Sequence, residues 1–77
     1  MNKKILLVDD EKGVVDMLKS YFEMHSFQVY TAYDGKTALQ QASHNPNIVL
    51  LDINMPGMDG LTVCEKIRDS FPAPFCF

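Results

Sequence analysis

The sequence predicts an α/β fold in which a parallel β-sheet is covered by helices on both faces. Two continuous apolar runs of strand length, residues 4–8 and 47–51, are typical of strands buried on both faces. Segments with helical periodicity separate the predicted strands, and strands that alternate with helices at this spacing form right-handed β-α-β crossovers. The predicted order is strand, helix, strand, helix, strand, helix.

The second predicted strand covers residues 27–33, between the two apolar runs. Phe27, Val29 and Thr31 lie on one of its faces, and the residues between them lie on the other. This alternation indicates a strand that is less buried than its neighbours. We expect it at an edge of the sheet.

The first predicted helix lies between Glu11 and His25. Val14, Val15, Leu18 and Phe22 recur there at helical spacing and give the helix one apolar face. A helix with one apolar face packs that face against the sheet.

The other two predicted helices are recognised mainly by their ends. Asp34 is a suitable N-cap for the second helix, and Pro46 prevents its continuation. Asp59 can cap the third helix in the same way, and Pro72 and Pro74 stop it. The second helix is therefore short.

Composition and charge exclude several classes of function. A chain of 77 residues, 47% hydrophobic and 22% charged, is ordinary for one small globular domain. The formal net charge is −3 and the basic residues are scattered, so direct nucleic-acid binding is not expected. No apolar run approaches the roughly 18 residues that span a bilayer, and the N-terminal run is too short for a signal peptide. We expect a cytoplasmic chain that binds neither nucleic acid nor a membrane.

The cysteines and histidines are not expected to carry chemistry. Cys64 and Cys76 form no CxxC pair and stand at no metal-ligand spacing from a histidine, so we expect reduced thiols. His25 and His44 stand alone, in contexts typical of solvated or capping residues.

Acidic residues follow two of the predicted strands. Asp9, Asp10 and Glu11 follow the first, and Asp52 follows the third. Ligands of open parallel sheets bind beyond the carboxyl ends of the strands, so these carboxylates would converge if the two strands are neighbours. Like charges about 4 Å apart repel by roughly 4 kcal/mol at an effective dielectric constant of about 20, and a cation relieves this. Oxygen ligands favour Mg²⁺, and the alternative is that these acids are solvated loop residues.

The spacing of residues argues against two other interpretations of the segment that begins at Asp52. A calcium-binding EF-hand loop would need oxygen ligands at its fifth and twelfth positions, which hold Pro56 and Val63. A phosphohydrolase with an aspartate nucleophile would gain from a second carboxylate two residues on, where Asn54 stands. The segment is therefore better suited to accept a phosphoryl group than to hydrolyse a phosphate ester.

The motifs "ILLVDDE" and "VLLDINMPGMDG" resemble the receiver domain of two-component response regulators. The resemblance covers residues 3 to about 70 without a gap. It implies a doubly wound, flavodoxin-like parallel sheet that lacks the last two strand-helix units of the family. Residues 1–70 would then form a partial receiver domain, and residues 71–77 the start of a fourth strand or an irregular tail.

The resemblance also implies a role for each motif residue. Asp52 would be the phosphoacceptor, taking a phosphoryl group from a sensor histidine kinase. Mg²⁺, or Mn²⁺ in its place, would be held by the carboxylates of Asp10 and Asp52, by the backbone carbonyl of Asn54, and by Asp9 mainly through water. Such a module is not an enzyme, although it takes part in its own phosphorylation.

Receivers also use a hydroxyl residue after the fourth strand and a lysine after the fifth to grip the phosphoryl group. Neither position exists in these 77 residues, so switching is expected to be impaired. Two alternatives remain open. One is an interaction module with the same fold that is not phosphorylated. The other is a small phosphoryl-transfer enzyme, which is disfavoured because Asn54 supplies no second acid.

The strand order of the family, 2-1-3, would leave the third strand at an open edge. Its unpaired backbone groups and apolar side chains favour association. We therefore expect a homo-oligomer, with residues 48–51 and the tail at residues 73–77 at the contact.

Overall fold

The structure is a computed structural model that describes residues 3–51, 60–70 and 75–76. None of the helices in these ranges is long and apolar enough to cross a membrane. The elements, in chain order, are β1 (Lys4–Val8), α1 (Lys12–Met24), β2 (Gln28–Ala32), α2 (Gly35–Gln41), the 3₁₀ turn η1 (Ala42–His44), β3 (Ile48–Leu51), α3 (Gly60–Ser70) and β4 (Phe75–Cys76).

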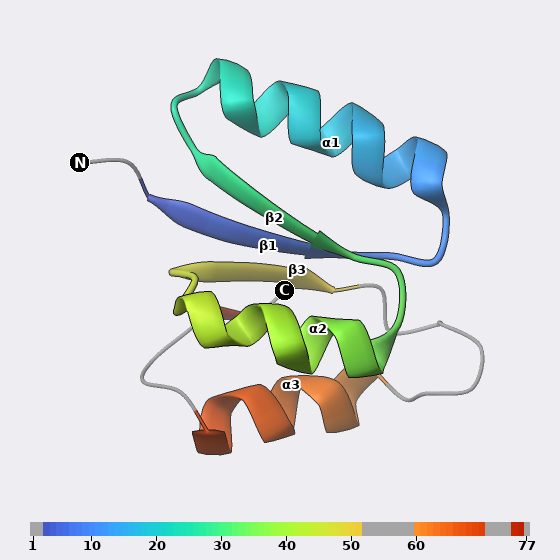
Figure 1. Cartoon of the computed structure of the whole chain (residues 1–77), viewed down its shortest axis with the longest axis vertical. Helices are drawn as coiled ribbons and strands as arrows, with labels where there is room; N and C mark the ends of the chain where they lie inside the picture. The colour runs from blue at the N-terminus through green and yellow to red at the C-terminus, as the bar shows by residue number, and fades with distance from the viewer. Residues whose placement is uncertain (1–2, 52–59, 71–74, 77) are drawn as a thin grey trace.

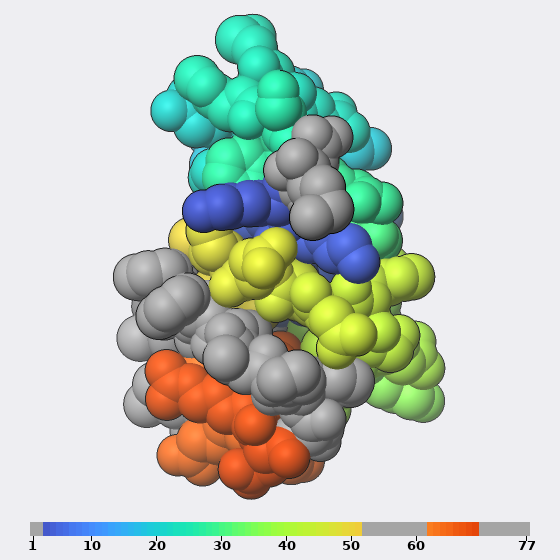
Figure 2. Space-filling view, turned by 90° about the vertical axis from the view of Figure 1, so that its left-hand side faces the viewer, coloured from blue at the N-terminus to red at the C-terminus, as the bar shows by residue number. Residues whose placement is uncertain are grey.

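The strands form one parallel sheet in the order β2-β1-β3-β4. Helix α1 lies on one side of the sheet, and α2 and α3 lie on the other (Figure 1). In the side view of Figure 2, α1 (cyan) and α3 (orange) lie at opposite ends, with β1 (blue) and the segment leading into β3 (yellow) between them. The predicted doubly wound α/β fold is confirmed.

Strand β1 lies between two neighbours and is buried on both faces. Ile5, Leu6, Leu7 and Val8 are each at most 2% exposed, as a continuous apolar run in a parallel sheet predicts. Strand β2 has one neighbour, and four of its five residues are half-buried or exposed. Its predicted position at an edge is confirmed.

Two apolar clusters fill the space between the sheet and its helices. On the side of α1, the buried residues are Ile5, Leu7 and Val15. On the side of α2 and α3, the buried residues are Leu6, Val8, Ala32, Ala38, Ala42, Val49, Val63 and Ile67. Successive residues of β1 alternate between the clusters because side chains of a strand alternate between its faces.

Helix α1 packs through the apolar face that the sequence predicts. Val15 is buried, and Leu18 and Phe22 pack beside it against the sheet. The chain then turns through Ser26, which adopts a left-handed φ of 67°. The ring of Phe22 meets that of Phe27 edge to face, with 5.2 Å between centroids, so the turn into β2 is packed against the helix.

Helix α2 begins where the sequence predicts and ends before Pro46, the residue predicted to stop it. The Asp34 side chain accepts a 2.7 Å hydrogen bond from the backbone N–H of Thr37, which confirms the N-cap. The α-helix ends at Gln41, before η1 and the left-handed Asn45, whose φ is 56°. Asparagine tolerates this conformation and so turns the chain before Pro46.

Helix α3 covers β3 on the side of α2. Val63 and Ile67 are fully buried and belong to the cluster that contains Val49 of β3. The predicted N-cap of this helix, Asp59, lies outside the described residues.

Cys64 of α3 is disulfide-bonded, so the expectation of reduced thiols is wrong for this residue. The sequence contains one other cysteine, Cys76, twelve residues further on. The backbone of residue 76 pairs with Val49, which shares a cluster with Val63 next to Cys64. The spacing of the two cysteines in the sequence did not indicate that positions 64 and 76 lie near each other. Their nearness depends on β4 pairing with β3, the strand that α3 covers.

The edge of β3 is not open where the sequence predicts it to be. Ile48 pairs with Phe75, and Val49 pairs with Cys76 of the same chain. A short extended segment therefore occupies the edge, because it satisfies backbone groups that would otherwise be unpaired. Association through this edge would have to displace β4 or use Leu50 and Leu51.

Candidate functional site

The carboxyl ends of β1 and β3 lie side by side, at the edge where the sequence predicts a site. The last pair of residues in the register of the two strands is Val8 and Leu51. Asp9 follows Val8 in the sequence, and Asp52 follows Leu51. The two acid-bearing strands are thus neighbours, which was the condition for a shared site.

Asp9 is fixed by two hydrogen bonds. Its backbone N–H donates to the carbonyl oxygen of Ala32 (3.2 Å), which ties the end of β1 to the end of β2. Its carboxylate oxygen Oδ1 accepts from the backbone N–H of Glu11 (3.0 Å). A carboxylate has about four acceptor positions, so this half-buried side chain keeps capacity for a further ligand.

Asp10 and Glu11 are exposed to solvent at the start of α1. Glu11 is the N-cap of the helix through its backbone, and its carbonyl oxygen accepts from the N–H of Val15 (3.2 Å). Carboxylates at this end of a helix interact favourably with its dipole. The Asp10 carboxylate is accessible to a hydrated cation.

The remaining predicted site residues, Asp52 and Asn54, lie outside the described residues. Within residues 3–51, 60–70 and 75–76, no three side chains of His, Cys, Asp or Glu gather into a metal site. Two of the four predicted metal ligands, Asp9 and Asp10, follow β1 in the sequence. The other two are Asp52 and Asn54. The role of each of the four residues stays a prediction.

Asp34 follows β2 and is the N-cap of α2. The hydrogen bonds from the backbone and side chain of Thr37, together with nearby Lys36, lower the pKa of the Asp34 carboxyl. Its contact with the start of α2 identifies it as a helix cap and not as a further ligand.

Two side chains near this edge form a contact that the sequence did not predict. The Lys12 ammonium lies 5.4 Å from the centre of the Tyr33 ring, a cation–π distance. The pair joins the start of α1 to the residue after β2. Its residues are 21 positions apart in the sequence, so no local pattern could have revealed the contact.

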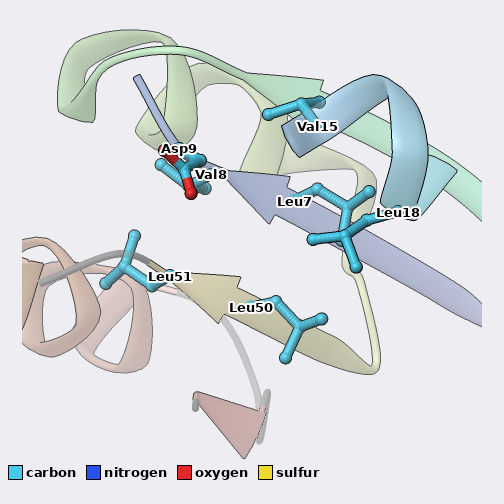
Figure 3. Close-up of a pocket in the computed structure, with 7 residues that line it drawn as sticks. All are labelled: Leu7, Val8, Asp9, Val15, Leu18, Leu50 and Leu51. Carbon is cyan, nitrogen blue, oxygen red and sulfur yellow. The ribbon is translucent and has the colours of Figure 1, made fainter. Parts of the chain in front are cut away.

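A cavity of about 470 Å³ extends from this edge along the side of the sheet that carries α1 (Figure 3). Asp9 is its only acidic lining residue among those described. The other lining residues are aliphatic: Leu7, Val8, Val15, Leu18, Leu50 and Leu51. The cavity therefore has a polar end beside the strand termini and an apolar remainder.

Residues 5–76 match the family described as the response regulator receiver domain. The match covers nearly the whole chain and agrees with the acid-bearing strand ends. The chain belongs to this family of two-component signalling modules, and the resemblance carried by its motifs is confirmed.

Solved receiver structures have the same fold. The chemotaxis protein CheY4 of Vibrio cholerae is 30% identical with a TM-score of 0.86, over 91% of this chain and 59% of that one. A chain in the complex of the histidine kinase ThkA with the response regulator protein TrrA is 38% identical with a TM-score of 0.84, over 96% of this chain and 66% of that one.

A third structure is the CheX-CheY-BeF3-Mg complex of Borrelia burgdorferi. The matching chain is 33% identical with a TM-score of 0.85, over 96% of this chain and 58% of that one. This chain therefore spans less than two thirds of the length of each of these three relatives.

Proposed function

We propose that this chain is a phosphoacceptor module that receives a phosphoryl group on Asp52 from a histidine kinase. The observation that supports this most is the register of β1 and β3, which ends with Val8 opposite Leu51. Asp9 and Asp52 are the next residues of the two strands. These neighbouring strand ends would together form one site.

Mg²⁺, or Mn²⁺, is the proposed cofactor, held by Asp9, Asp10, Asp52 and Asn54. The donors offered at the end of β1 are carboxylate oxygens, one half-buried and one exposed, which suits a hard cation that keeps several waters. The bound ion would neutralise charge that develops on the phosphoryl oxygens. A related CheY was solved as a complex named with BeF3 and Mg, which supports the same chemistry here.

In the proposed reaction, a carboxylate oxygen of Asp52 attacks the phosphorus of a phosphohistidine. A phosphorus–oxygen bond forms and the phosphorus–nitrogen bond breaks, with the electron pair remaining on the imidazole. Phosphoryl transfer depends mainly on in-line positioning and charge neutralisation, so it needs no further nucleophile or base from this chain. The chain would accept the group without acting as an enzyme on another substrate.

The proposed partner is a sensor histidine kinase, and the proposed location is the cytoplasm. The relative found in a complex of a histidine kinase with a response regulator supports this type of partner. Direct nucleic-acid binding is not part of the proposal, because the chain has a net charge of −3 and scattered basic residues.

The test is the intact mass of the chain after incubation with acetyl phosphate and Mg²⁺. The unmodified chain should gain one phosphoryl group, and the Asp52→Asn variant should gain none. Asp16→Asn, which removes an exposed carboxylate from α1, is the matched control and should be phosphorylated normally. Chelation of the metal should abolish the gain, and equal phosphorylation of Asp52→Asn would contradict the proposal.

A further inference from the structure

Lys12 is the basic residue nearest in the sequence to the acids that follow β1. It stands two residues after Asp10 and three after Asp9. Its side chain is exposed, and a lysine ammonium is a compact charge on a flexible four-carbon stem. Nothing in the sequence prevents such a side chain from pairing with one of these two carboxylates.

The structure gives the Lys12 ammonium a different contact. It lies 5.4 Å from the centre of the Tyr33 ring, whose face attracts a cation. Within the described part of the chain, no ion pair joins Lys12 to Asp9 or Asp10. The start of α1 and the end of β2 lie at the same end of the sheet, on the right in Figure 1, which brings the two side chains together.

Tyr33 lies on the side of β1 that is opposite to β3. Val8, the last residue of β1, pairs with Ala32 of β2 on one side and with Leu51 of β3 on the other. Tyr33 directly follows Ala32 in the sequence. Neighbouring strands are about 4.8 Å apart, so the ends of β2 and β3 are separated by roughly 10 Å. The contact with Tyr33 therefore holds the Lys12 ammonium on the β2 side of this edge.

The residues on both sides of Tyr33 have contacts of their own. The carbonyl oxygen of Ala32 accepts from the N–H of Asp9 (3.2 Å), which ties the residue before Tyr33 to the end of β1. The carboxylate of Asp34 accepts from the N–H of Thr37 (2.7 Å) and is directed to the start of α2. The ammonium thus meets the ring and not the carboxylate that follows it.

The carboxylates after β1 fit a metal ion. Asp9 uses one oxygen to accept from the N–H of Glu11, which leaves further acceptor positions on its carboxylate. The Asp10 side chain is exposed. Carboxylate oxygens suit Mg²⁺ and Mn²⁺. A lysine paired with either carboxylate would occupy donors that the ion needs.

We propose that Tyr33 is a positioning residue that keeps the Lys12 ammonium off the carboxylates of Asp9 and Asp10. The role rests on the proposed function, because it concerns the metal ion that these carboxylates would bind. A carboxylate paired with lysine must give up that pair before it binds the ion, and a nearby positive charge also repels the ion. Tyr33 thereby raises the affinity of this edge for a divalent cation.

The experiment measures the affinity of the 77-residue chain for Mn²⁺ from the electron paramagnetic resonance signal of the free ion. It is done at low salt, where surface charges are least screened. Tyr33→Leu removes the ring and frees Lys12, so the affinity should fall by about two- to fivefold, the size of an exposed cation–π contact. Tyr33→Phe keeps the ring and should bind Mn²⁺ like the unmodified chain.

A double variant assigns the effect to Lys12. Lys12→Gln removes the ammonium and should bind Mn²⁺ at least as tightly as the unmodified chain. When Lys12→Gln is combined with Tyr33→Leu, loss of the ring should have no further effect. Tyr21→Leu and Lys19→Gln make the same substitutions at exposed residues further along α1, and both should leave the affinity unchanged. Circular dichroism of each variant verifies that it is folded.

Two results would overturn the role of Tyr33 alone. The first is an equal affinity of Tyr33→Leu and Tyr33→Phe, which is also the outcome if the freed Lys12 pairs with Asp16, one turn further along α1. The second is a loss of affinity that persists in the double variant, since Tyr33 would then act without Lys12. Asp10→Asn tests the metal site itself and should weaken Mn²⁺ binding. If it does not, the proposed cofactor site is wrong and the role of Tyr33 is overturned with it.

Discussion

Asp34 illustrates how one carboxylate sets the stability of a short helix. Its side chain accepts from the N–H of Thr37, and this bond lowers the pKa of Asp34 in the folded chain. A lowered pKa means that the carboxylate stabilises the fold at pH values above its unfolded pKa. The contribution is lost as the pH falls through the folded pKa.

We therefore predict that Asp34→Ala lowers the midpoint of thermal unfolding at neutral pH. Because alanine cannot accept the hydrogen bond of Thr37, α2 loses its cap. The difference between the variant and the unmodified chain should shrink as the carboxylate protonates in acid. Thermal unfolding followed by circular dichroism at several pH values measures both effects.

Asp34→Asn is the matched control for this prediction. Asparagine keeps an oxygen that can cap the helix but does not titrate. It should unfold close to the unmodified chain at neutral pH and without the acid-dependent loss that Asp34 contributes. A midpoint of Asp34→Ala equal to that of the unmodified chain at neutral pH would refute the capping role.

The sequence predicted single residues well where their effect is local. Asp34 as an N-cap followed from its place before a helical segment. Two other features were not predictable in this way. The Lys12 contact with Tyr33 and the disulfide at Cys64 join segments that are distant in the sequence. Such contacts depend on the packing of whole elements, which no short pattern encodes.

At the scale of elements, α3 is stabilised by two fully buried residues and by Cys64, which is buried and disulfide-bonded. Val63 and Ile67 are fully buried, one turn apart, against the side of the sheet that carries Val49. The rest of the described helix surface is mainly exposed. Burial of this narrow face holds the helix on the sheet.

We predict that Ile67→Ala leaves the chain largely unfolded or close to it. Removal of a buried isoleucine side chain costs about 2–5 kcal/mol. A core of this size rarely supplies more than about 3–5 kcal/mol. Urea titration should show a much lower midpoint for this variant.

Lys66→Ala is the control, since it changes the adjacent, exposed residue and alanine is a good helix former. Its midpoint should stay within the range of ordinary surface substitutions. If Ile67→Ala unfolded at the same urea concentration as Lys66→Ala, α3 would not depend on its buried face.

Among the elements, the continuous apolar runs were the most informative. They predicted β1 at residues 4–8 and β3 at residues 47–51, and the structure places β3 at Ile48–Leu51. These patterns did not predict that β4 pairs with β3. A segment of two residues has no periodicity, and its place is decided by the unpaired edge that it meets.

At the scale of the whole molecule, signalling requires that a phosphoryl group at one edge alter a distant surface. The resemblance to receivers implies that a hydroxyl residue and a lysine from later strands grip this group, and a polypeptide of residues 1–77 offers neither. One charge-assisted hydrogen bond contributes about 1.5–3 kcal/mol, which corresponds to about ten- to a hundredfold in an equilibrium. We expect a polypeptide limited to residues 1–77, if phosphorylated, to hold the group without a large change of conformation.

We predict that beryllofluoride with Mg²⁺ shifts the amide resonances of Asp9 and Asp10 but leaves those of Val63 and Ile67 nearly unchanged. Two-dimensional NMR of the labelled chain measures both groups of resonances. Asp52→Asn is the control and should show neither change. Large shifts throughout α3 in the unmodified chain would mean that the switch operates without the missing residues.

The central position of β1 also determines when the sheet can assemble. β1 precedes the other strands of this sheet in the chain, yet its partner β3 follows only after two helices and β2. Closing so long a segment costs entropy before the pairing returns any stability, which slows folding relative to a helical bundle of the same length. On the ribosome, one side of β1 must wait unpaired until Leu51 has emerged, and its apolar side chains are exposed to other chains during that interval.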